Sequence, residues 1–393
     1  MLKQVFDKEQ LAKTLTSSDV WQWDLLSTYA DVEKAVDHTV RYWKLHNLTL
    51  SSLEKRMING KSVFVPAVME DAFAIKLLDR FVRRIYKIRQ SDRNRIVRQL
   101  KTLLKDSGEY HVLRLDIKDC YESIQSEVLV NKFEEEMILA PQCIKLLNDI
   151  FTDLRIKEGM HGLPRGVSIS PTLAELYLEG LDKKIAAHND VIYSARYVDD
   201  IILLVPVGKE NEVQADVQSF MHQMGLTLNA NEEKYYSGLS TSAEFDYLGY
   251  SIKVEPQNKK PNKVSLKISQ SKINKIKKRI VKSFCDYKKK NDITLLKRRL
   301  EYLCMLKIVR KSKNGDLLAG ISHNYQYVTD GFECLKEVDG FLCHQLSNPR
   351  FGLNQQEQEI IKKISIYGNA RKGNIGKFSK RQTVKIMRVW KNA

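Results

Sequence analysis

Three aspartates stand where two expected strands could bring their carboxylates together. Asp116 lies near the end of the alternating segment HVLRLDI at 111–117, and Asp199 and Asp200 separate two apolar runs within VIYSARYVDDIILLVPV at 191–207. The alternation predicts a strand, and the two apolar runs predict a β-hairpin with the acids at its tip. Adjacent carboxylates between apolar strands repel one another unless a cation neutralises them. The spacing therefore predicts a site for hard divalent cations.

Such a site fits phosphoryl transfer with two metal ions. Two hard cations about 3.5–4 Å apart need shared carboxylate oxygens from separate strands. One ion activates a 3′-hydroxyl, and the other holds a triphosphate and stabilises the leaving pyrophosphate. We therefore predict two Mg²⁺ ions as cofactors, with Mn²⁺ as the alternative. A purely structural role for Asp200, as a turn former, stays open.

The segments around these strands show mostly helical periodicity. Apolar residues at three- and four-residue spacing predict helices within 69–104, 126–158 and about 209–224. The turn GLPRG at 162–166 precedes another helix, for which we expect Ser170 to be the N-cap and Pro171 the first residue. Short strands are expected at 226–228 and 245–253. From residue 263 onward we expect a helix whose apolar side includes Ile268, Ile273, Ile276, Ile280 and Phe284.

The positive charge is concentrated in one segment. The chain of 393 residues has a formal net charge of +17. Residues 251–313 contain 21 Lys or Arg against 4 Asp or Glu, so this segment accounts for the whole excess. The alternative is a helix face that is simply exposed to solvent. So high a concentration of positive charge nevertheless favours a polyanionic partner, and nucleic acid is favoured over an anionic membrane.

Cysteine spacing and hydropathy indicate the compartment. The six cysteines are scattered and form no CxxC pair, which argues against a disulfide framework and fits a reducing cytoplasm. No apolar run approaches the ~18 residues of a membrane span. The first residues, MLKQVFDKEQLAKTL, lack the apolar core of a secretory signal. We expect a cytoplasmic protein with no membrane partner.

Five motifs, in the same order, resemble those of the reverse transcriptases. The resemblance is clear over about residues 60–255, and the co-occurrence is more specific than any single motif. The matching segments are LRLDIKDCYESI (113–124), GLPRGVSISPTLAELYL (162–178), RYVDDIILLV (196–205), NEEKYYS (231–237) and FDYLGYSI (245–252). The resemblance implies an α+β right-hand polymerase fold, with fingers, a palm built on an antiparallel sheet, and a helical thumb. It divides the chain into an N-terminal helical extension (1–60), fingers and palm (60–255), and a basic thumb with a C-terminal region (256–393).

The resemblance also implies roles for the metal and nucleotide site. Asp116 and Asp199 would hold the metals, with Asp200 as the third acid and the Ile117 carbonyl as a further ligand. Tyr121 would be the aromatic gate that excludes a 2′-hydroxyl, although a core tyrosine is the alternative. The other implied nucleotide-binding residues are Arg165, Gly166 and Lys234, with Lys234 approaching the triphosphate.

One motif departs from the family pattern. Arg165 stands where the family commonly has glutamine, and its guanidinium could fork onto phosphate or a base edge. We expect Gly162 and Gly166 to let the backbone come close to nucleic acid.

Two further surfaces are implied for the nucleic acid. The primer grip would be formed by Phe245, Leu248, Gly249 and Tyr250, for which a plain strand pair is the alternative. On the basic segment, we expect a phosphate-facing stripe of Lys272, Lys275, Lys278, Arg279 and Lys282.

The implied function is RNA-directed DNA polymerase, with deoxynucleoside triphosphates, an RNA template and a DNA product. The residues after the last motif suffice for a thumb but not for an added ribonuclease H. The segment KIRQSDRNRIVRQL (87–100) and the GLPRGVSIS turn resemble bacterial defence-associated enzymes, with the type 3 system of two reverse transcriptases the nearest. That subgroup implies a noncoding RNA template and a second reverse transcriptase subunit or a homo-oligomer. The alternatives are a template-independent or protein-primed DNA polymerase of the abortive-infection type, and a catalytically silent nucleic-acid scaffold.

Overall fold

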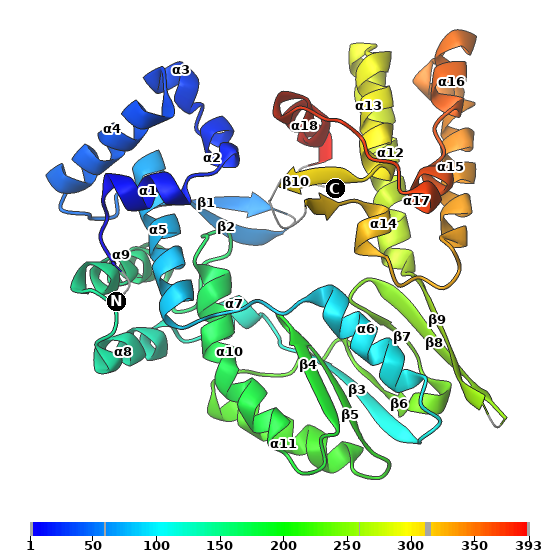
Figure 1. The fold of residues 1–393 in the computed structure, drawn as a ribbon, viewed down its shortest axis with the longest axis horizontal. Coiled ribbons are helices and arrows are strands. Elements are labelled where there is room, and N and C mark those ends of the chain that lie inside the picture. The colour runs from blue at the N-terminus through cyan, green and yellow to red at the C-terminus, as the bar shows by residue number, and fades with distance from the viewer. Residues whose placement is uncertain (1–2, 59, 259, 311–315, 391–393) are drawn as a thin grey trace. The chain divides into compact units, whose positions relative to one another are not determined.

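The computed structural model describes residues 3–58, 60–258, 260–310 and 316–390 (Figure 1). The chain forms two compact units, each built from two separate stretches of sequence. The first unit contains residues 1–92 and 110–238, and the second contains residues 93–109 and 239–393. These limits differ from the ranges 1–60, 60–255 and 256–393, because residues 93–109 and 239–255 group with the C-terminal segment. The assignment of fingers, palm and thumb to those ranges stays a prediction.

The first unit begins with helices that pack around a long central helix. Phe73, Leu77 and Phe81 of that central helix, α5, are buried at the spacing expected from the sequence. Asp31 caps α4 by accepting a hydrogen bond from the Lys34 amide. The elements are α1 (Lys8–Thr14), α2 (Ser17–Gln22), α3 (Leu25–Tyr29), α4 (Val32–Leu45), the antiparallel hairpin β1 (Leu53–Ile58) and β2 (Lys61–Pro66), and α5 (Met69–Ile85).

A four-stranded antiparallel sheet in the order β4-β5-β3-β6 carries the aspartates. The expected strand at 111–117 and the hairpin at 191–207 are both present. On one face, Leu113, Leu115 and Leu203 join the main core beneath α10 and α11. The strands are β3 (Tyr110–Asp116), β4 (Tyr193–Tyr197), β5 (Asp200–Pro206) and β6 (Tyr236–Leu239), and the helices of this region are α7 (Cys120–Ser123), α8 (Ser126–Glu136), α9 (Pro141–Glu158), α10 (Ser170–Ala186), α11 (Glu210–Gln223) and the 3-10 turn η1 (Glu232–Lys234).

The N-cap expected for α10 is wrong by one residue. Ile169 occupies the cap position, and Ser170 is already the first helical residue. The Ser170 hydroxyl donates instead to the Pro164 carbonyl oxygen at 2.6 Å. Ser170 therefore fastens the GLPRG turn to the helix that follows it.

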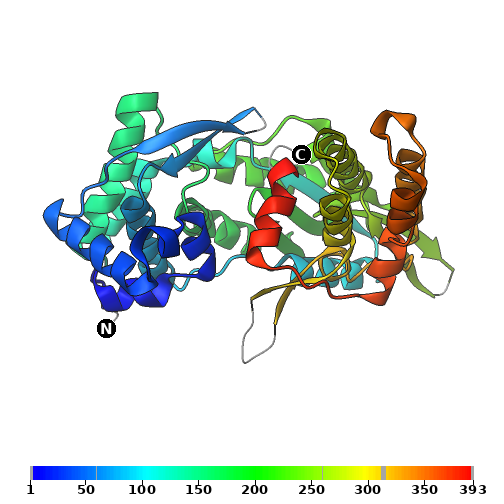
Figure 2. The ribbon, with the colours of Figure 1, turned by 90° about the horizontal axis from the view of Figure 1, so that it is seen from above.

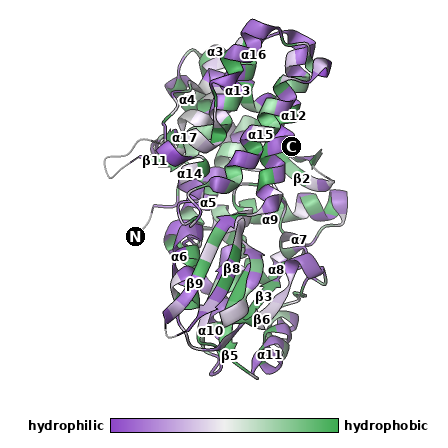
Figure 3. Cartoon of the chain, turned by 90° about the vertical axis from the view of Figure 1, so that its right-hand side faces the viewer, coloured by the Kyte–Doolittle hydropathy of each residue, from purple (hydrophilic) through white to green (hydrophobic). Residues whose placement is uncertain are grey.

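The second unit contains a three-stranded antiparallel sheet in the order β7-β8-β9. Asn262 on β9 donates to the carbonyl oxygens of Leu104 and Asp106, which ties helix α6 to the sheet. The expectation of a helix from 263 is wrong up to Ile268, because Val264, Leu266 and Ile268 alternate with polar residues at strand spacing. Figure 3 shows both hydrophilic and hydrophobic residues along β9. The elements are α6 (Arg93–Leu104), η2 (Ser240–Ser242), β7 (Glu244–Tyr247), β8 (Tyr250–Gln257) and β9 (Lys260–Ile268).

The rest of the second unit is mostly helical and has its own core. Helices α12 and α13 lie side by side, with Phe284 and Leu300 in the shared interior (Figure 2). Trp390 closes this core by donating from Nε1 to the Arg279 carbonyl oxygen at 3.0 Å. The elements are α12 (Gln270–Lys290), α13 (Ile293–Cys304), the hairpin β10 (Lys307–Arg310) and β11 (Leu317–Ala319), α14 (Ile321–Asn324), η3 (Glu333–Leu335), α15 (Lys336–Leu346), η4 (Pro349–Phe351), α16 (Gln355–Lys362), α17 (Ile366–Lys372), α18 (Lys380–Met387) and η5 (Arg388–Trp390).

Among the described residues, none of the helices combines the length and the apolar character that crossing a bilayer requires. The α+β class with antiparallel sheets is as expected from the sequence.

Candidate metal centre

Strand pairing brings the three aspartates to one end of the sheet. Asp116 lies directly opposite Asp200 in the β3–β5 ladder, and the Ile117 amide donates to the Asp199 carbonyl oxygen at 3.0 Å. The turn between β4 and β5 contains Val198 with a φ of 61°, a conformation that is costly for a β-branched residue. One carboxylate oxygen from each aspartate lies within 4.8 Å of the others. The predicted convergence of these acids is therefore present.

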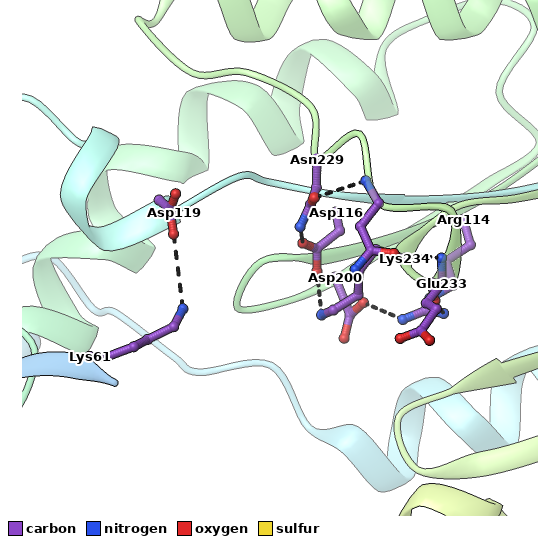
Figure 4. A network of polar contacts seen from close by, with 9 residues as sticks. Lys61, Arg114, Asp116, Asp119, Asp200, Asn229, Glu233 and Lys234 are labelled. Atoms are coloured by element: carbon purple, nitrogen blue, oxygen red, sulfur yellow. Dashed lines mark hydrogen bonds and ion pairs between the residues drawn. The ribbon is translucent and has the colours of Figure 1, made fainter. Parts of the chain in front are cut away.

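Asp116 is held from both sides. Its side chain is buried at 3% exposure, Oδ1 accepts a hydrogen bond from Lys234 Nζ at 2.9 Å, and Oδ2 accepts one from Asn229 Nδ2 at 2.8 Å (Figure 4). The Asn229 amide also donates to the Asp116 carbonyl oxygen at 2.8 Å. Both carboxylate oxygens are thus oriented by the loop that follows α11.

Asp200 has a different partner. Arg114, two residues before Asp116 and on the same face of β3, donates from Nη2 to Asp200 Oδ1 at 3.0 Å. Its Nη1 donates to the Glu233 carbonyl oxygen at 3.1 Å, which links Asp200 to the short turn carrying Lys234 (Figure 4). Arg114 therefore connects the third carboxylate and the lysine segment.

The charges of the cluster shift its proton affinities. Burial, followed by the negative charges of Asp116 and Asp200, raises the pKa of Asp199. Burial alone would lower the pKa of Lys234, but the hydrogen bond to Asp116 and the nearby aspartates raise it. Three carboxylates face two cationic side chains here, so the cluster retains excess negative charge.

The donor set fits hard divalent cations. Carboxylate oxygens are the ligands that Mg²⁺ and Mn²⁺ take, and the three aspartates come from two separate segments, with Asp116 at the end of β3 and Asp199 and Asp200 where β5 begins. Asp116 and Asp200 both have protein partners in this structure, so an ion would share these carboxylates with Lys234, Asn229 and Arg114, and the assignment of Asp116 and Asp199 as the metal ligands stays a prediction. The Ile117 carbonyl belongs to the residue next to Asp116, and its role as a ligand stays a prediction.

The expected sugar gate lies on the short helix that follows β3. Tyr121 is half-buried, and its ring centroid lies 5.3 Å from Arg165 Cζ. Arg165 donates from both Nε and Nη2 to the Glu122 carboxylate, and the Nη2 bond measures 2.8 Å. Glu122 is therefore the partner of Arg165 in this structure, and the expected contact of Arg165 with a nucleotide or the template stays a prediction.

The two glycines of the GLPRG turn lie against the chain itself. A Cβ at Gly162 would overlap the Glu122 carbonyl, and a Cβ at Gly166, where φ is 93°, would overlap Val63 and Phe64 of β2. We expected these glycines to admit nucleic acid. In this structure they allow close packing of the turn between α7 and the β1–β2 hairpin, and their approach to nucleic acid stays a prediction.

The expected primer grip is a two-residue hairpin turn in the second unit. Leu248 and Gly249 have φ values of 48° and 79°, the conformation of a type I′ turn between paired Tyr247 and Tyr250. Phe245 and Tyr250 are buried, so within this motif they support the turn from inside.

Arg93 braces this turn. Its Nε donates to the Leu248 carbonyl oxygen at 2.8 Å, and its Cζ lies 5.1 Å from the Tyr250 ring centroid and 4.9 Å from that of Tyr325. The structure places it against the turn of its own unit.

The basic stripe on α12 is present with one exception. Lys272, Lys275 and Lys278 are exposed, and Lys282 lies one turn further on and is half-buried. Although Lys275 is exposed, partial desolvation of its ammonium group, together with the charges of Arg279, Lys272 and Lys278, lowers its pKa. Arg279 differs, because its guanidinium lies 5.7 Å from the Trp390 ring centroid and packs toward the chain.

Sequence reasoning missed three residues that organise these sites. Arg114 could have been found, since strand alternation already places it on the face of Asp116. Glu122 follows Tyr121 directly, but nothing in its spacing indicates a partner in the GLPRG turn. Asn229 approaches Asp116 only because Ile117 and Leu228 form an isolated bridge.

Comparison with known proteins identifies the family of the chain. A family model described as reverse transcriptase (RNA-dependent DNA polymerase) matches residues 40–252, more than half of the chain. A curated relative, the COX1/OXI3 intron 1 protein of Saccharomyces cerevisiae, is 24% identical, and the match covers 39% of this chain and 25% of that protein. The chain thus spans about a quarter of the length of this relative.

Two telomerases are among the solved structures that match this chain. Apo telomerase from Candida tropicalis, truncated from its C-terminal domain, gives a TM-score of 0.36 with 13% identity over 56% of this chain and 59% of that one. Telomerase from Candida albicans, in complex with the TWJ fragment of telomeric RNA, gives 0.37 with 12% identity over 87% of this chain and 66% of that one.

Proposed function

Because the chain belongs to the reverse transcriptase (RNA-dependent DNA polymerase) family, we propose that it is an active RNA-directed DNA polymerase. One observation carries the proposal of activity. Asp116, Asp199 and Asp200 converge at the end of the sheet, and Lys234 binds the most buried of them. A nucleic-acid scaffold without activity has no need of a buried carboxylate cluster, whose mutual repulsion destabilises the fold.

The residues of the site can be given roles in nucleotide addition. Asp116 and Asp199 would hold two divalent ions, which when bound lower the pKa of a 3′-hydroxyl and neutralise the charge on a triphosphate. Lys234 carries a proton at Nζ and can donate it to the leaving pyrophosphate. Asn229 fixes the orientation of the Asp116 carboxylate. Tyr121 would exclude the 2′-hydroxyl of a ribonucleotide.

We further propose that the template is a noncoding RNA and that the protein serves bacterial antiviral defence in the cytoplasm. The support for the defence role is the sequence resemblance of residues 87–100 and the GLPRGVSIS turn. All six cysteines are free, which supports a reducing compartment. A second reverse transcriptase subunit or a second copy of this chain would be the protein partner.

Primer extension tests the polymerase directly. The purified full chain is incubated with a defined RNA template, an annealed DNA primer, MgCl₂ and the four deoxynucleotides. Extension that follows the template sequence is the expected result. Incorporation that ignores the template would identify a template-independent polymerase, and RNA binding without incorporation would identify a scaffold. Sequencing of the RNA and DNA that copurify with the protein then identifies the natural template.

A further inference from the structure

Arg165 is fixed at both its backbone and its side chain. Its carbonyl oxygen accepts a hydrogen bond from the Phe64 amide at 2.7 Å, and its guanidinium forks onto Glu122. Burial alone would raise the pKa of Glu122, but the hydrogen bond from Arg165 holds it below its usual range. The pairing with Glu122 orients the Arg165 guanidinium, whose Cζ lies 5.3 Å from the Tyr121 ring centroid.

The surrounding backbone leaves this arrangement little freedom. The Leu163 amide donates to the Tyr121 carbonyl oxygen at 2.7 Å, and Gly162 lies against the Glu122 carbonyl. The turn at 162–166 is thereby joined to the helix that carries Tyr121. On its other side, Gly166 packs against Val63 and Phe64 of β2. The turn thus packs against helix α7 on one side and against the β1–β2 hairpin on the other.

We propose that Arg165 and Glu122 act as a clamp that positions the Tyr121 ring and thereby sets the discrimination between deoxyribonucleotides and ribonucleotides. The inference rests on the proposed function, because it concerns the selectivity of that same site. Arg165 is then a positioning residue that acts through Tyr121. A ring acting as a steric gate must be held still, since a small displacement admits a hydroxyl group.

The forked contact with Glu122 favours a positioning role for Arg165 over direct binding of the triphosphate. Two donors of the Arg165 guanidinium are engaged by one carboxylate in a forked geometry. A phosphate that took the Nε and Nη2 donors would have to displace Glu122 and leave its carboxylate beside the incoming negative charge. The ring contact needs no such rearrangement.

Selectivity measurements test the clamp. The ratio of kcat/KM for a deoxynucleotide to kcat/KM for the matching ribonucleotide is measured for the parent, Arg165→Gln, Glu122→Gln and the double variant. A cation–π contact is worth an energy equivalent to roughly 2- to 30-fold in an equilibrium constant, so each single change should lower the ratio by about that factor. The double variant should match the singles, because the pair acts as a unit. In a Tyr121→Ala background, Arg165→Gln should leave the ratio unchanged.

A matched control is Arg155→Gln, which removes an exposed ion pair with Glu127 in the same unit. An equal loss of kcat/KM for both nucleotide types in Arg165→Gln would show that Arg165 binds the triphosphate, and would overturn the clamp. Complete inactivity of the parent would overturn the proposed function instead. The clamp is then still tested by ¹⁹F NMR of 3-fluorotyrosine placed at position 121. Its resonance should shift in Arg165→Gln and stay in place in Arg155→Gln, and an unmoved resonance in both would contradict the clamp.

Discussion

Arg114 and Asp200 form an ion pair of 3.0 Å across neighbouring strands, and the Arg114 side chain is almost fully buried. The Arg114 guanidinium therefore neutralises the Asp200 carboxylate, which is the third acid of the cluster. Through the Glu233 carbonyl oxygen, the same guanidinium also holds the turn that carries Lys234. Asp200 is therefore tied to the position of Lys234 as well as to the acidic cluster.

Replacing Arg114 by Gln should reduce both stability and activity. Removing one partner of a buried ion pair typically costs about 3–5 kcal/mol of unfolding free energy, and we expect the lower end because the Asp200 side chain is 19% exposed. We expect kcat to fall more than RNA affinity, because the Lys234 turn loses its anchor. Denaturant titration and primer extension measure the two effects. Arg83→Gln, which removes a half-exposed ion pair with Asp79 in the same unit, is the control. Equal effects of both changes would argue against a special role for Arg114.

Removal of the Lys234 charge should separate metal binding from catalysis. Lys234 Nζ bonds to Asp116 Oδ1 and so competes with any cation for that oxygen. In Lys234→Gln we expect Mn²⁺ to bind about 3- to 10-fold more tightly, because one positive charge has left the cluster. The polymerisation rate should nevertheless fall. Calorimetric titration with Mn²⁺ gives the affinity, and weaker binding in the variant would contradict the assignment.

The approach of the three aspartates could be predicted from the sequence because each lies at the end of a recognisable strand. Asp116 ends an alternating strand, and Asp199 and Asp200 interrupt two apolar runs, so pairing of these strands determines their approach. The pairing of Arg165 with Glu122 could not be predicted, because the two residues lie 43 positions apart and only the folded turn brings them together. Residues 263–268 were wrongly predicted to be helical because the basic residues and apolar spacing of the following segment fit a helix. The alternation of Val264, Leu266 and Ile268 is instead typical of a strand.

The basic stripe should control nucleic-acid affinity through phosphate contacts. Lys272, Lys275 and Lys278 are exposed along α12. Each phosphate contact contributes a log–log salt slope of about −0.7 to −0.9, so changing all three lysines to Gln should flatten the slope by roughly two to three units. Anisotropy titrations at several salt concentrations measure this. Changing the exposed Lys13, Lys34 and Lys44 to Gln is the control. An unchanged slope would show that the stripe is only solvated, and a loss confined to one RNA sequence would indicate base reading.

Asp71 should make stability depend on pH. Burial raises its pKa to about 6, although the Ser51 and Ser52 amides favour the charged form. A folded-state pKa above the unfolded value means that the folded chain binds the proton more tightly. The associated stability is present below about pH 4 and is lost as the pH rises through 6, by roughly 3 kcal/mol in total. Asp71→Asn should lack this component. Denaturant titrations of both proteins at pH 4.5 and 7.5 measure it, and parallel stability changes would refute the assignment.

The central claim is that the three converging aspartates support metal-dependent synthesis of DNA on RNA. The most direct measurement is RNA-templated primer extension with Mg²⁺ by the parent, by Asp199→Asn, and by Asp190→Asn as a control before the same hairpin. Because the first change removes ligand charge but little volume, we expect it to abolish extension while the unfolding transition and RNA affinity stay as in the parent. Asp190→Asn should extend normally. Undiminished extension by a folded Asp199→Asn variant would contradict the account.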